Sequence, residues 1–152
     1  MAASVKAIPD GYEAVIPYLV VADGAGAIDF YKKVFGATEI MRYEDNGKVG
    51  HAELRIGRGI LMVADEYPEM GYRSPKKGEL PPAGMMIYVE DVDKTVRRAL
   101  DEGATEERPV ADQFYGDRAG GIVDPYGHRW YIATHIENVS PEEMEKRAAA
   151  NR

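Results

Sequence analysis

The sequence contains no cysteine in its 152 residues. Disulfide bonds, thiolate nucleophiles and cysteine-ligated metal sites are therefore excluded. Because proteins without cysteine suit a reducing compartment, we expect a cytoplasmic protein. Long apolar runs are missing too: none approaches the roughly 20 residues that span a bilayer, and the N-terminal segment has no apolar core of a secretory signal. A membrane partner is therefore not expected.

Positive charge is also scarce. Lys and Arg number 19 against 26 Asp and Glu, which gives a formal net charge of −7. Since no stretch gathers basic side chains on one face, a nucleic-acid partner is not expected. The sequence shows neither a Ser-His-Asp order nor a phosphate-binding or dinucleotide-binding motif. Its 45% hydrophobic and 30% charged residues are those of an ordinary globular protein.

A short repeat is the most informative feature that is present. The tetrapeptide Gly-Ala-Thr-Glu begins at Gly36 and again at Gly103. Each copy follows an apolar stripe at helical spacing, with its glycine at the position that ends a helix. Val-x-Asp stands directly before each stripe, at 21–23 and 89–91. A common helix-ending sequence would explain the tetrapeptide but not this matching order, which indicates a duplicated unit.

Each half of the sequence predicts a strand, a helix and three more strands. The predicted strands are 13–23, 38–45, 51–57 and 60–65 in the first half, and 85–91, 104–116, 119–124 and 128–136 in the second. The predicted helices are 24–36 and 92–103. We expect one α+β domain over 1–152, made of a module at about 13–66, a structureless connecting loop at about 67–83, a second module at about 84–137 and a terminal helix at about 140–150, capped by Ser140.

Three segments carry a family resemblance. They are "IDFYKKVFGA" (28–37), "VEDVD" (89–93) and "DPYGHRW" (124–130). In this order and spacing they resemble the glyoxalase-like branch of the vicinal oxygen chelate superfamily, over about 13–137. That superfamily includes glyoxalase I, extradiol dioxygenases, fosfomycin-resistance enzymes and bleomycin-resistance binding proteins. The resemblance implies two tandem βαβββ modules, each an open half-barrel sheet with a helix on its convex face. It also implies an inter-module cavity and a homodimer.

The resemblance implies a divalent metal held by His, Gln or Glu side chains from four strands, and each position is testable here. The matching positions hold Ile16 or Pro17, Leu61 or Met62, Gly84, Met85 or Met86, and Tyr131. None of these is a usual ligand for such a metal. We therefore expect no metal, no cofactor and no catalytic residue of the family's usual kind. The alternative is a metal held by other residues, such as His51 and Glu53, which share one strand face.

Alternation along the strands predicts which side chains leave the helix side of each sheet. Trp130 and Ile132 would face the helix, and the intervening residues would face inward. Large aromatic residues, methionines and a few polar groups then suit a flat or hydrophobic ligand. The predicted ligand-binding residues are Tyr18, His51, Met62, Met86, Tyr88, Phe114, Arg129 and Tyr131. In the turn before 119–124, we expect Asp117 and Arg118 to form a solvated ion pair, with contact between Arg118 and an anionic ligand as the alternative.

Three functions follow. The first is a metal-free binding protein of the bleomycin-resistance type, which sequesters a small hydrophobic or aromatic molecule in the inter-module cavity as a homodimer. The second is a metal-dependent lyase or isomerase related to glyoxalase I that uses non-standard ligands. The third is a surface-interaction module in which the same tyrosines and methionines fill the half-barrel and leave no cavity.

Overall fold

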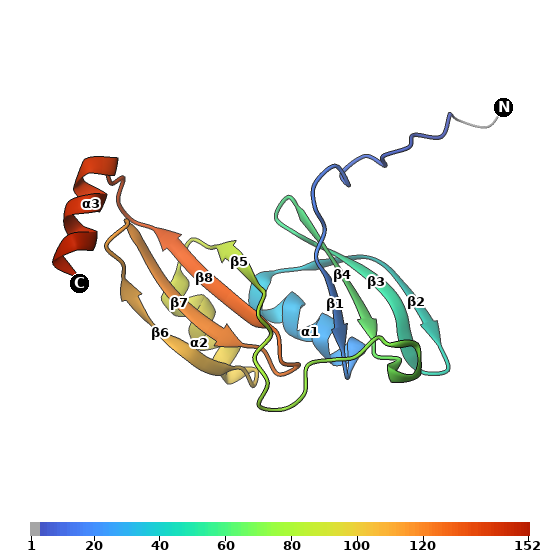
Figure 1. The fold of residues 1–152 in the computed structure, drawn as a ribbon. Helices are drawn as coiled ribbons and strands as arrows, with labels where there is room; N and C mark the ends of the chain where they lie inside the picture. Colours follow the sequence, from blue (N-terminus) through green and yellow to red (C-terminus); the bar gives the residue numbers. More distant parts are fainter. Residues whose placement is uncertain (1–3) are drawn as a thin grey trace. The chain divides into compact units, whose positions relative to one another are not determined.

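The computed structural model describes residues 4–152 and divides into two compact units, Met1–Ser74 (unit 1) and Pro75–Arg152 (unit 2). Unit 1 contains β1 (Tyr18–Val21), α1 (Gly24–Phe35), β2 (Thr38–Asp45), β3 (Lys48–Ile56), β4 (Gly59–Asp65) and the short helix η1 (Pro68–Met70). Unit 2 contains β5 (Gly84–Tyr88), α2 (Val92–Asp101), β6 (Thr105–Asp112), β7 (Asp117–Val123), β8 (Arg129–His135) and α3 (Pro141–Ala150) (Figure 1).

Each unit is built on a four-stranded mixed sheet. The strand order is β1-β4-β3-β2 in unit 1 and β5-β8-β7-β6 in unit 2. In each sheet the first strand runs parallel to its neighbour and the other pairs are antiparallel. The two β-α-β-β-β units and the terminal helix confirm the predicted α+β fold.

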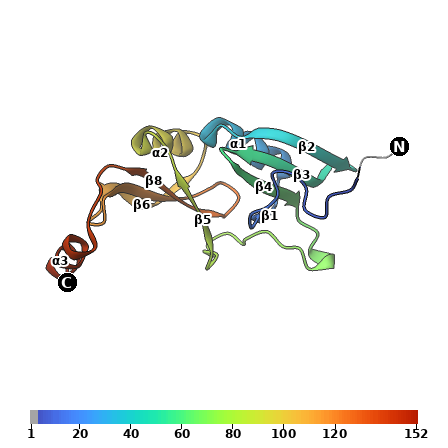
Figure 2. The same cartoon turned by 90° about the horizontal axis from the view of Figure 1, so that it is seen from above.

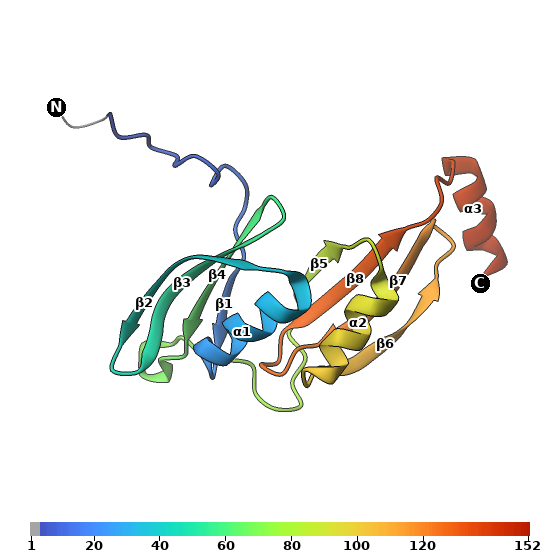
Figure 3. The same cartoon turned by 180° about the vertical axis from the view of Figure 1, so that it is seen from behind.

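In each unit one helix covers one face of the sheet (Figures 2 and 3). The stripe of α1 that sequence periodicity predicts is buried at Ala27, Ile28, Tyr31 and Val34. On α2 the buried stripe is Val92, Val96 and Ala99. The sheets bury alternate residues against these helices. The buried strand residues include Val21, Leu54 and Val63 in unit 1, and Ile122, Trp130 and Ile132 in unit 2. Burial of each large apolar side chain stabilises the fold by about 1.5–3 kcal/mol.

The two repeated motifs have the same structural role in both units. Asp23 and Asp91 are the N-caps of α1 and α2, and each carboxylate accepts a backbone N–H of the first helical turn. Gly36 and Gly103 follow the helices with φ of 68° and 103°, which side chains with a Cβ adopt only with strain. The alanine that follows each glycine is buried. The repeat therefore records how each helix begins and how the chain leaves it.

The structure corrects three local predictions. The first strand begins at Tyr18 rather than at 13, so Ile16 precedes it. The segment predicted as structureless holds η1, where Pro68 stands at the helix start and Gly71 has a φ of 85°. Strand β7 begins at Asp117, so that residue and Arg118 belong to the sheet and not to an exposed turn.

Candidate functional site

Unit 1 contains a pocket of about 460 Å³. One wall comes from the sheet face opposite α1 and from the end of β4, and the other from the segment that follows β4. The sheet contributes Tyr18, Val20, Gly50, Ala64 and Asp65, and the following segment contributes Tyr67, Met70 and Tyr72. Three tyrosine rings and a thioether therefore surround a space that this sheet face does not fill.

Strand pairing places the sheet residues of the pocket. Tyr18 lies opposite Met62, and Val20 lies opposite Ala64, in the parallel pair of β1 and β4. Side chains that alternate with the buried Leu19 and Val21 point away from α1. Of the predicted ligand-binding residues, Tyr18 and Met62 are thus neighbours on one face, and Tyr18 lines the pocket.

The loop wall is held by its own hydrogen bonds. Tyr67 and Tyr72 exchange two backbone hydrogen bonds, from Tyr67 N to Tyr72 O at 2.8 Å and from Tyr72 N to Tyr67 O at 3.1 Å. The Glu66 carboxylate accepts from the Ser74 amide at 3.0 Å and from its hydroxyl at 2.5 Å. The Ser74 hydroxyl and amide lower the pKa of Glu66. These contacts close a small loop and direct its two tyrosines to the pocket.

His51 joins Tyr18 in a polar pair. The Tyr18 hydroxyl and His51 Nδ1 share a hydrogen bond of 2.8 Å, and their ring centroids lie 5.5 Å apart. His51 Nε2 lies 3.7 Å from Glu53 Oε2, which also accepts a hydrogen bond from the Tyr12 hydroxyl at 3.5 Å. Burial, with smaller contributions from Tyr72 and Glu53, raises the pKa of Tyr18, so its hydroxyl keeps its proton at neutral pH.

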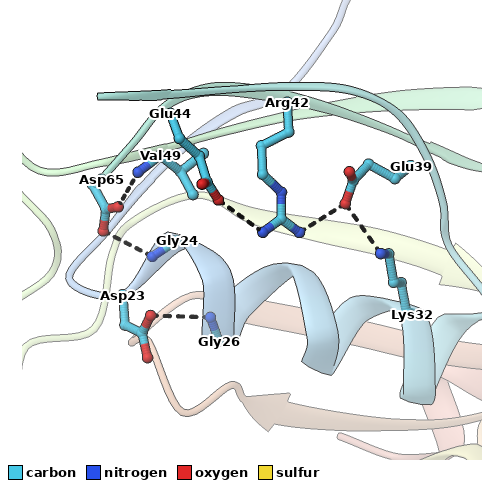
Figure 4. Close-up of polar contacts among 9 residues, drawn as sticks. All are labelled: Asp23, Gly24, Gly26, Lys32, Glu39, Arg42, Glu44, Val49 and Asp65. Carbon is cyan, nitrogen blue, oxygen red and sulfur yellow. Dashed lines mark hydrogen bonds and ion pairs between the residues drawn. The ribbon is translucent and has the colours of Figure 1, made fainter. Parts of the chain in front are cut away.

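Asp65 supports the site through the backbone. The side chain is 8% exposed, and its carboxylate accepts from Gly24 N at 2.8 Å and from Val49 N at 2.6 Å (Figure 4). The same carboxylate therefore fixes the start of α1 and the start of β3. Because both oxygens already accept backbone amides, Asp65 shapes the pocket and is not a free acceptor for a ligand.

Unit 2 holds the remaining predicted ligand-binding residues. Met86 and Tyr131 are partners in the β5–β8 pair, at the place in the sheet that Tyr18 and Met62 hold in unit 1. Arg129 donates to Glu107, with Nε at 3.1 Å from Oε2, and to the Pro81 carbonyl at 3.1 Å.

The Glu107 carboxylate raises the pKa of Arg129, whose guanidinium carbon lies 5.7 Å from the Tyr131 ring centroid. Phe114 lies in the turn between β6 and β7, where its ring meets Tyr115 edge-on at 5.3 Å. Arg129 is therefore engaged by its own unit, while Phe114 lies beyond the strands.

Tyr88 belongs to a network that the sequence did not predict. Its hydroxyl donates to Asp117 Oδ2 at 2.7 Å, and His135 Nδ1 lies 2.8 Å from Oδ1 of the same carboxylate. His135 Nε2 lies 2.8 Å from Asn138 Oδ1. Burial alone would raise the pKa of Asp117, but its hydrogen bonds with His135 and Tyr88 lower it overall. The hydrogen bonds to Asp117 and Asn138 raise the pKa of His135.

The expected pair of Asp117 and Arg118 is wrong. The Asp117 carboxylate is 4% exposed and faces Tyr88 and His135. Arg118 instead donates two hydrogen bonds to the Asp93 carboxylate, from Nε at 2.7 Å and from Nη2 at 2.9 Å, and a third to Asp112 at 3.0 Å. Adjacent residues of a strand point to opposite faces, which is why two neighbours of opposite charge find different partners.

The residues present do not fit the metal that the fold family implies. Pro17 and Ile16 precede β1, so the position opposite Met62 is held by Tyr18. Its counterpart pair in unit 2 is Met86 with Tyr131. Thioether and phenol groups are poor ligands for a hard divalent ion, which prefers carboxylate, carbonyl or imidazole. Over residues 4–152, no three His, Asp or Glu side chains gather as a metal site would require.

Most of the pocket wall was not predicted from the sequence. Tyr67, Met70 and Tyr72 lie in the segment predicted to be structureless, while Gly50 has no side chain and Ala64 has only a methyl group to suggest a site. Two tyrosines only five positions apart in a proline- and glycine-rich loop were the available signal, since binding residues are often carried on loops.

The comparisons with known proteins define the class. The family model for the Glyoxalase/Bleomycin resistance protein/Dioxygenase superfamily matches residues 13–132. The chain therefore belongs to this superfamily. None of the helices in the described part of the chain is long and apolar enough to cross a membrane.

Particular relatives share much of the chain. It is 40% identical over 136 residues to an uncharacterized protein of Mycobacterium bovis, covering 87% of this chain and 90% of that protein. Among solved structures it resembles TioX from Micromonospora sp. ML1, with 29% identity and a TM-score of 0.62 over 80% of this chain and 97% of TioX. A glyoxalase/bleomycin resistance protein/dioxygenase family enzyme from Burkholderia phytofirmans PsJN has 20% identity and a TM-score of 0.66 over 80% of this chain and 97% of that enzyme, which supports the fold.

Proposed function

We propose that the protein binds a small, flat aromatic or hydrophobic molecule in the pocket of unit 1 and sequesters it, as bleomycin-resistance binding proteins of the same superfamily do. The observation that carries the proposal is the pocket of about 460 Å³ walled by Tyr18, Tyr67, Tyr72 and Met70. Small-molecule sites have volumes of about 300–1,000 Å³ and mostly apolar walls with few polar groups.

The wall chemistry supports a planar ligand. Tyrosine faces stack on aromatic rings, and each such contact contributes about 0.5–1.5 kcal/mol beyond the area that it buries. Met70 adds a flexible, polarizable side chain that adapts to the outline of a ligand. Val20 and Ala64 add small apolar side chains to the lining. A flat molecule with a single aromatic ring or two fused rings suits this arrangement better than a highly charged molecule.

The test is calorimetric titration with naphthalene-type probes, joined to amide NMR shifts that map the site. We expect Tyr72→Ala to weaken binding by about 5- to 10-fold, the loss of one stacking contact. Tyr72 is 56% exposed, so its truncation leaves the core intact. Tyr126→Ala, the same change in a turn of unit 2, is the matched control and is expected to bind as the wild type does.

Two results would overturn the proposal. One is the failure of every planar apolar probe to bind the folded wild-type protein. The other is binding that Tyr67→Ala and Tyr72→Ala leave unchanged. We further propose that the protein works as a cytoplasmic homodimer, and light scattering on the purified chain tests its oligomeric state directly.

The second candidate is a metal-dependent lyase or isomerase, and the observation that favours it is the 3.7 Å approach of His51 Nε2 to Glu53 Oε2. An imidazole and a carboxylate on one strand face are two donors of a metal site. Metal analysis after dialysis separates the two functions. A retained stoichiometric metal that His51→Ala abolishes would favour the lyase, and metal content that is negligible in both proteins favours the binding protein.

A further inference from the structure

The polar pair of Tyr18 and His51 has a consequence for what the pocket selects. Tyr18 lines the pocket, and its hydroxyl already shares a hydrogen bond of 2.8 Å with His51 Nδ1. A tyrosine hydroxyl has one donor and two acceptor positions, so one bond to His51 leaves it further capacity. That remaining capacity lies at the wall of an otherwise largely apolar pocket.

The pair is adjustable. When His51 Nδ1 carries no proton, the Tyr18 hydroxyl donates to it and its oxygen accepts from a ligand. In the other tautomer His51 donates to the Tyr18 oxygen, and the Tyr18 proton is free to reach a ligand. Glu53 Oε2 lies 3.7 Å from His51 Nε2, beyond hydrogen-bond distance, so both tautomers of His51 are open to the pair.

The charged groups near the pocket do not favour an ionic ligand. The Asp65 carboxylate, part of the lining, already accepts from Gly24 N and Val49 N. The Lys48 ammonium lies 4.8 Å from the Tyr67 ring centroid, where the face of that ring attracts it. Because the Asp65 carboxylate is already hydrogen-bonded, it attracts a cationic ligand less strongly. The Lys48 ammonium is already held at the Tyr67 ring, so it attracts an anionic ligand less strongly.

We infer that the pocket selects an aromatic molecule that carries a hydroxyl group, of the phenol or naphthol class, and that the Tyr18 hydroxyl, held by His51, binds this group. The inference rests on the proposed function and adds the ligand's polar group to it. A hydroxyl both donates and accepts, so it pairs with Tyr18 in either tautomer of His51. A plain hydrocarbon of the same shape satisfies neither state and displaces water from the Tyr18 hydroxyl without replacing its hydrogen bond.

The experiment compares two probes of nearly equal shape, 2-naphthol and naphthalene, by fluorescence titration of the full chain. We expect the wild type to bind 2-naphthol about 5- to 10-fold more tightly than naphthalene, which corresponds to one net hydrogen bond. In Tyr18→Phe the ring stays and the hydroxyl goes. The preference is then expected to vanish, so that the two probes bind the variant with similar affinity, because 2-naphthol has lost its hydrogen bond.

A second variant tests the partner. His51→Ala releases the Tyr18 hydroxyl from its partner and is expected to reduce the preference for 2-naphthol by about 2- to 5-fold. His128→Ala, the same change in unit 2, is the control and is expected to keep the wild-type preference. Thermal melts of all variants confirm that each is folded before its binding is compared.

The outcomes separate the two proposals. If neither probe binds the wild type, the proposed function itself fails. If both probes bind the wild type with equal affinity, the binding function stands and the selection of a hydroxyl is wrong. If Tyr18→Phe weakens both probes equally, Tyr18 acts through packing alone, and the inference is overturned in the same way.

Discussion

The two units share the same β-α-β-β-β arrangement, but different side chains accept the hydrogen bond from the first backbone amide of the helix. In unit 1 the first amide of α1, from Gly24, donates to the carboxylate of Asp65 at the end of β4. In unit 2 the first amide of α2, from Val92, donates at 2.9 Å to the hydroxyl of Thr134 near the end of β8. Asp65 also accepts the Val49 amide, whereas Thr134 also donates to the Val89 carbonyl at 2.8 Å.

Unit 2 also has a buried carboxylate of its own. Asp117 in β7 is buried and bonded to two titratable side chains. A buried carboxylate is stable only if its oxygens are paired. Unit 1 pairs Asp65 with backbone amides, and unit 2 pairs Asp117 with Tyr88 and His135. Duplication therefore preserved which backbone groups need a partner, but not which side chain provides it.

The largest expected effect comes from removing the carboxylate of unit 1. Asp65→Ala leaves the amides of Gly24 and Val49 without their acceptor at the junction of α1 and β3. We expect the free energy of unfolding to fall by about 3–5 kcal/mol, measured by urea denaturation, because two charge-assisted hydrogen bonds are lost together. A loss below about 1 kcal/mol would show that water replaces the carboxylate and that the contrast with unit 2 is unimportant.

Substitution of Gly24 is informative because packing and helix propensity predict opposite changes in stability. A Cβ at this position would lie 2.8 Å from the Val49 Cβ, whereas unit 2 accommodates a whole valine at position 92. We expect Gly24→Ala to destabilise the fold by about 1–3 kcal/mol through overpacking. Helix propensity alone would stabilise the variant by up to about 1 kcal/mol, so a higher melting temperature would contradict the predicted clash.

Thr134→Val is the matched change in unit 2. It keeps the side-chain shape and removes the hydroxyl that joins the Val92 amide to the Val89 carbonyl. We expect a loss of about 1–2 kcal/mol in the same denaturation experiment, smaller than that of Asp65→Ala, because the hydroxyl is neutral. Equal losses in the two variants would remove the distinction between the carboxylate and the hydroxyl.

The smallest expected effect is a pH dependence that belongs to unit 2. The folded-state pKa of His135 is raised, so its contribution to stability is complete below its unfolded pKa, about 6.5, and is lost as pH rises through the folded value. The folded-state pKa of Asp117 is lowered, so its contribution is complete above about 4 and is lost as pH falls.

Both contributions are therefore complete between about pH 4 and 6.5. We expect His135→Asn to flatten the decline of stability above that range, measured as melting temperature against pH. His128→Asn is the control and is expected to leave the decline in place. An unchanged profile in His135→Asn would show that other groups cause it.

Much of the fold was predictable because its signals are local. The apolar stripes, the capping residues Asp23 and Asp91, and the glycines at 36 and 103 each act within one or two turns of chain. The start of β1 was harder to predict, since Val15 and Ile16 before the strand are β-branched like Val20 and Val21 within it. Pairing with β4 decides that boundary, and pairing is not visible in a single segment.

The sequence by itself determined the duplicated β-α-β-β-β order, the faces of the helices and the absence of usual ligands at the family's metal positions. Only the tertiary structure decided that Tyr67 and Tyr72 join Tyr18 around a pocket, that Tyr18 meets His51, and that Asp117 faces Tyr88 and His135 rather than Arg118. The physical reason is range. Caps and periodicity depend on neighbours in sequence, whereas a pocket and a buried hydrogen bond depend on strands that meet across tens of residues.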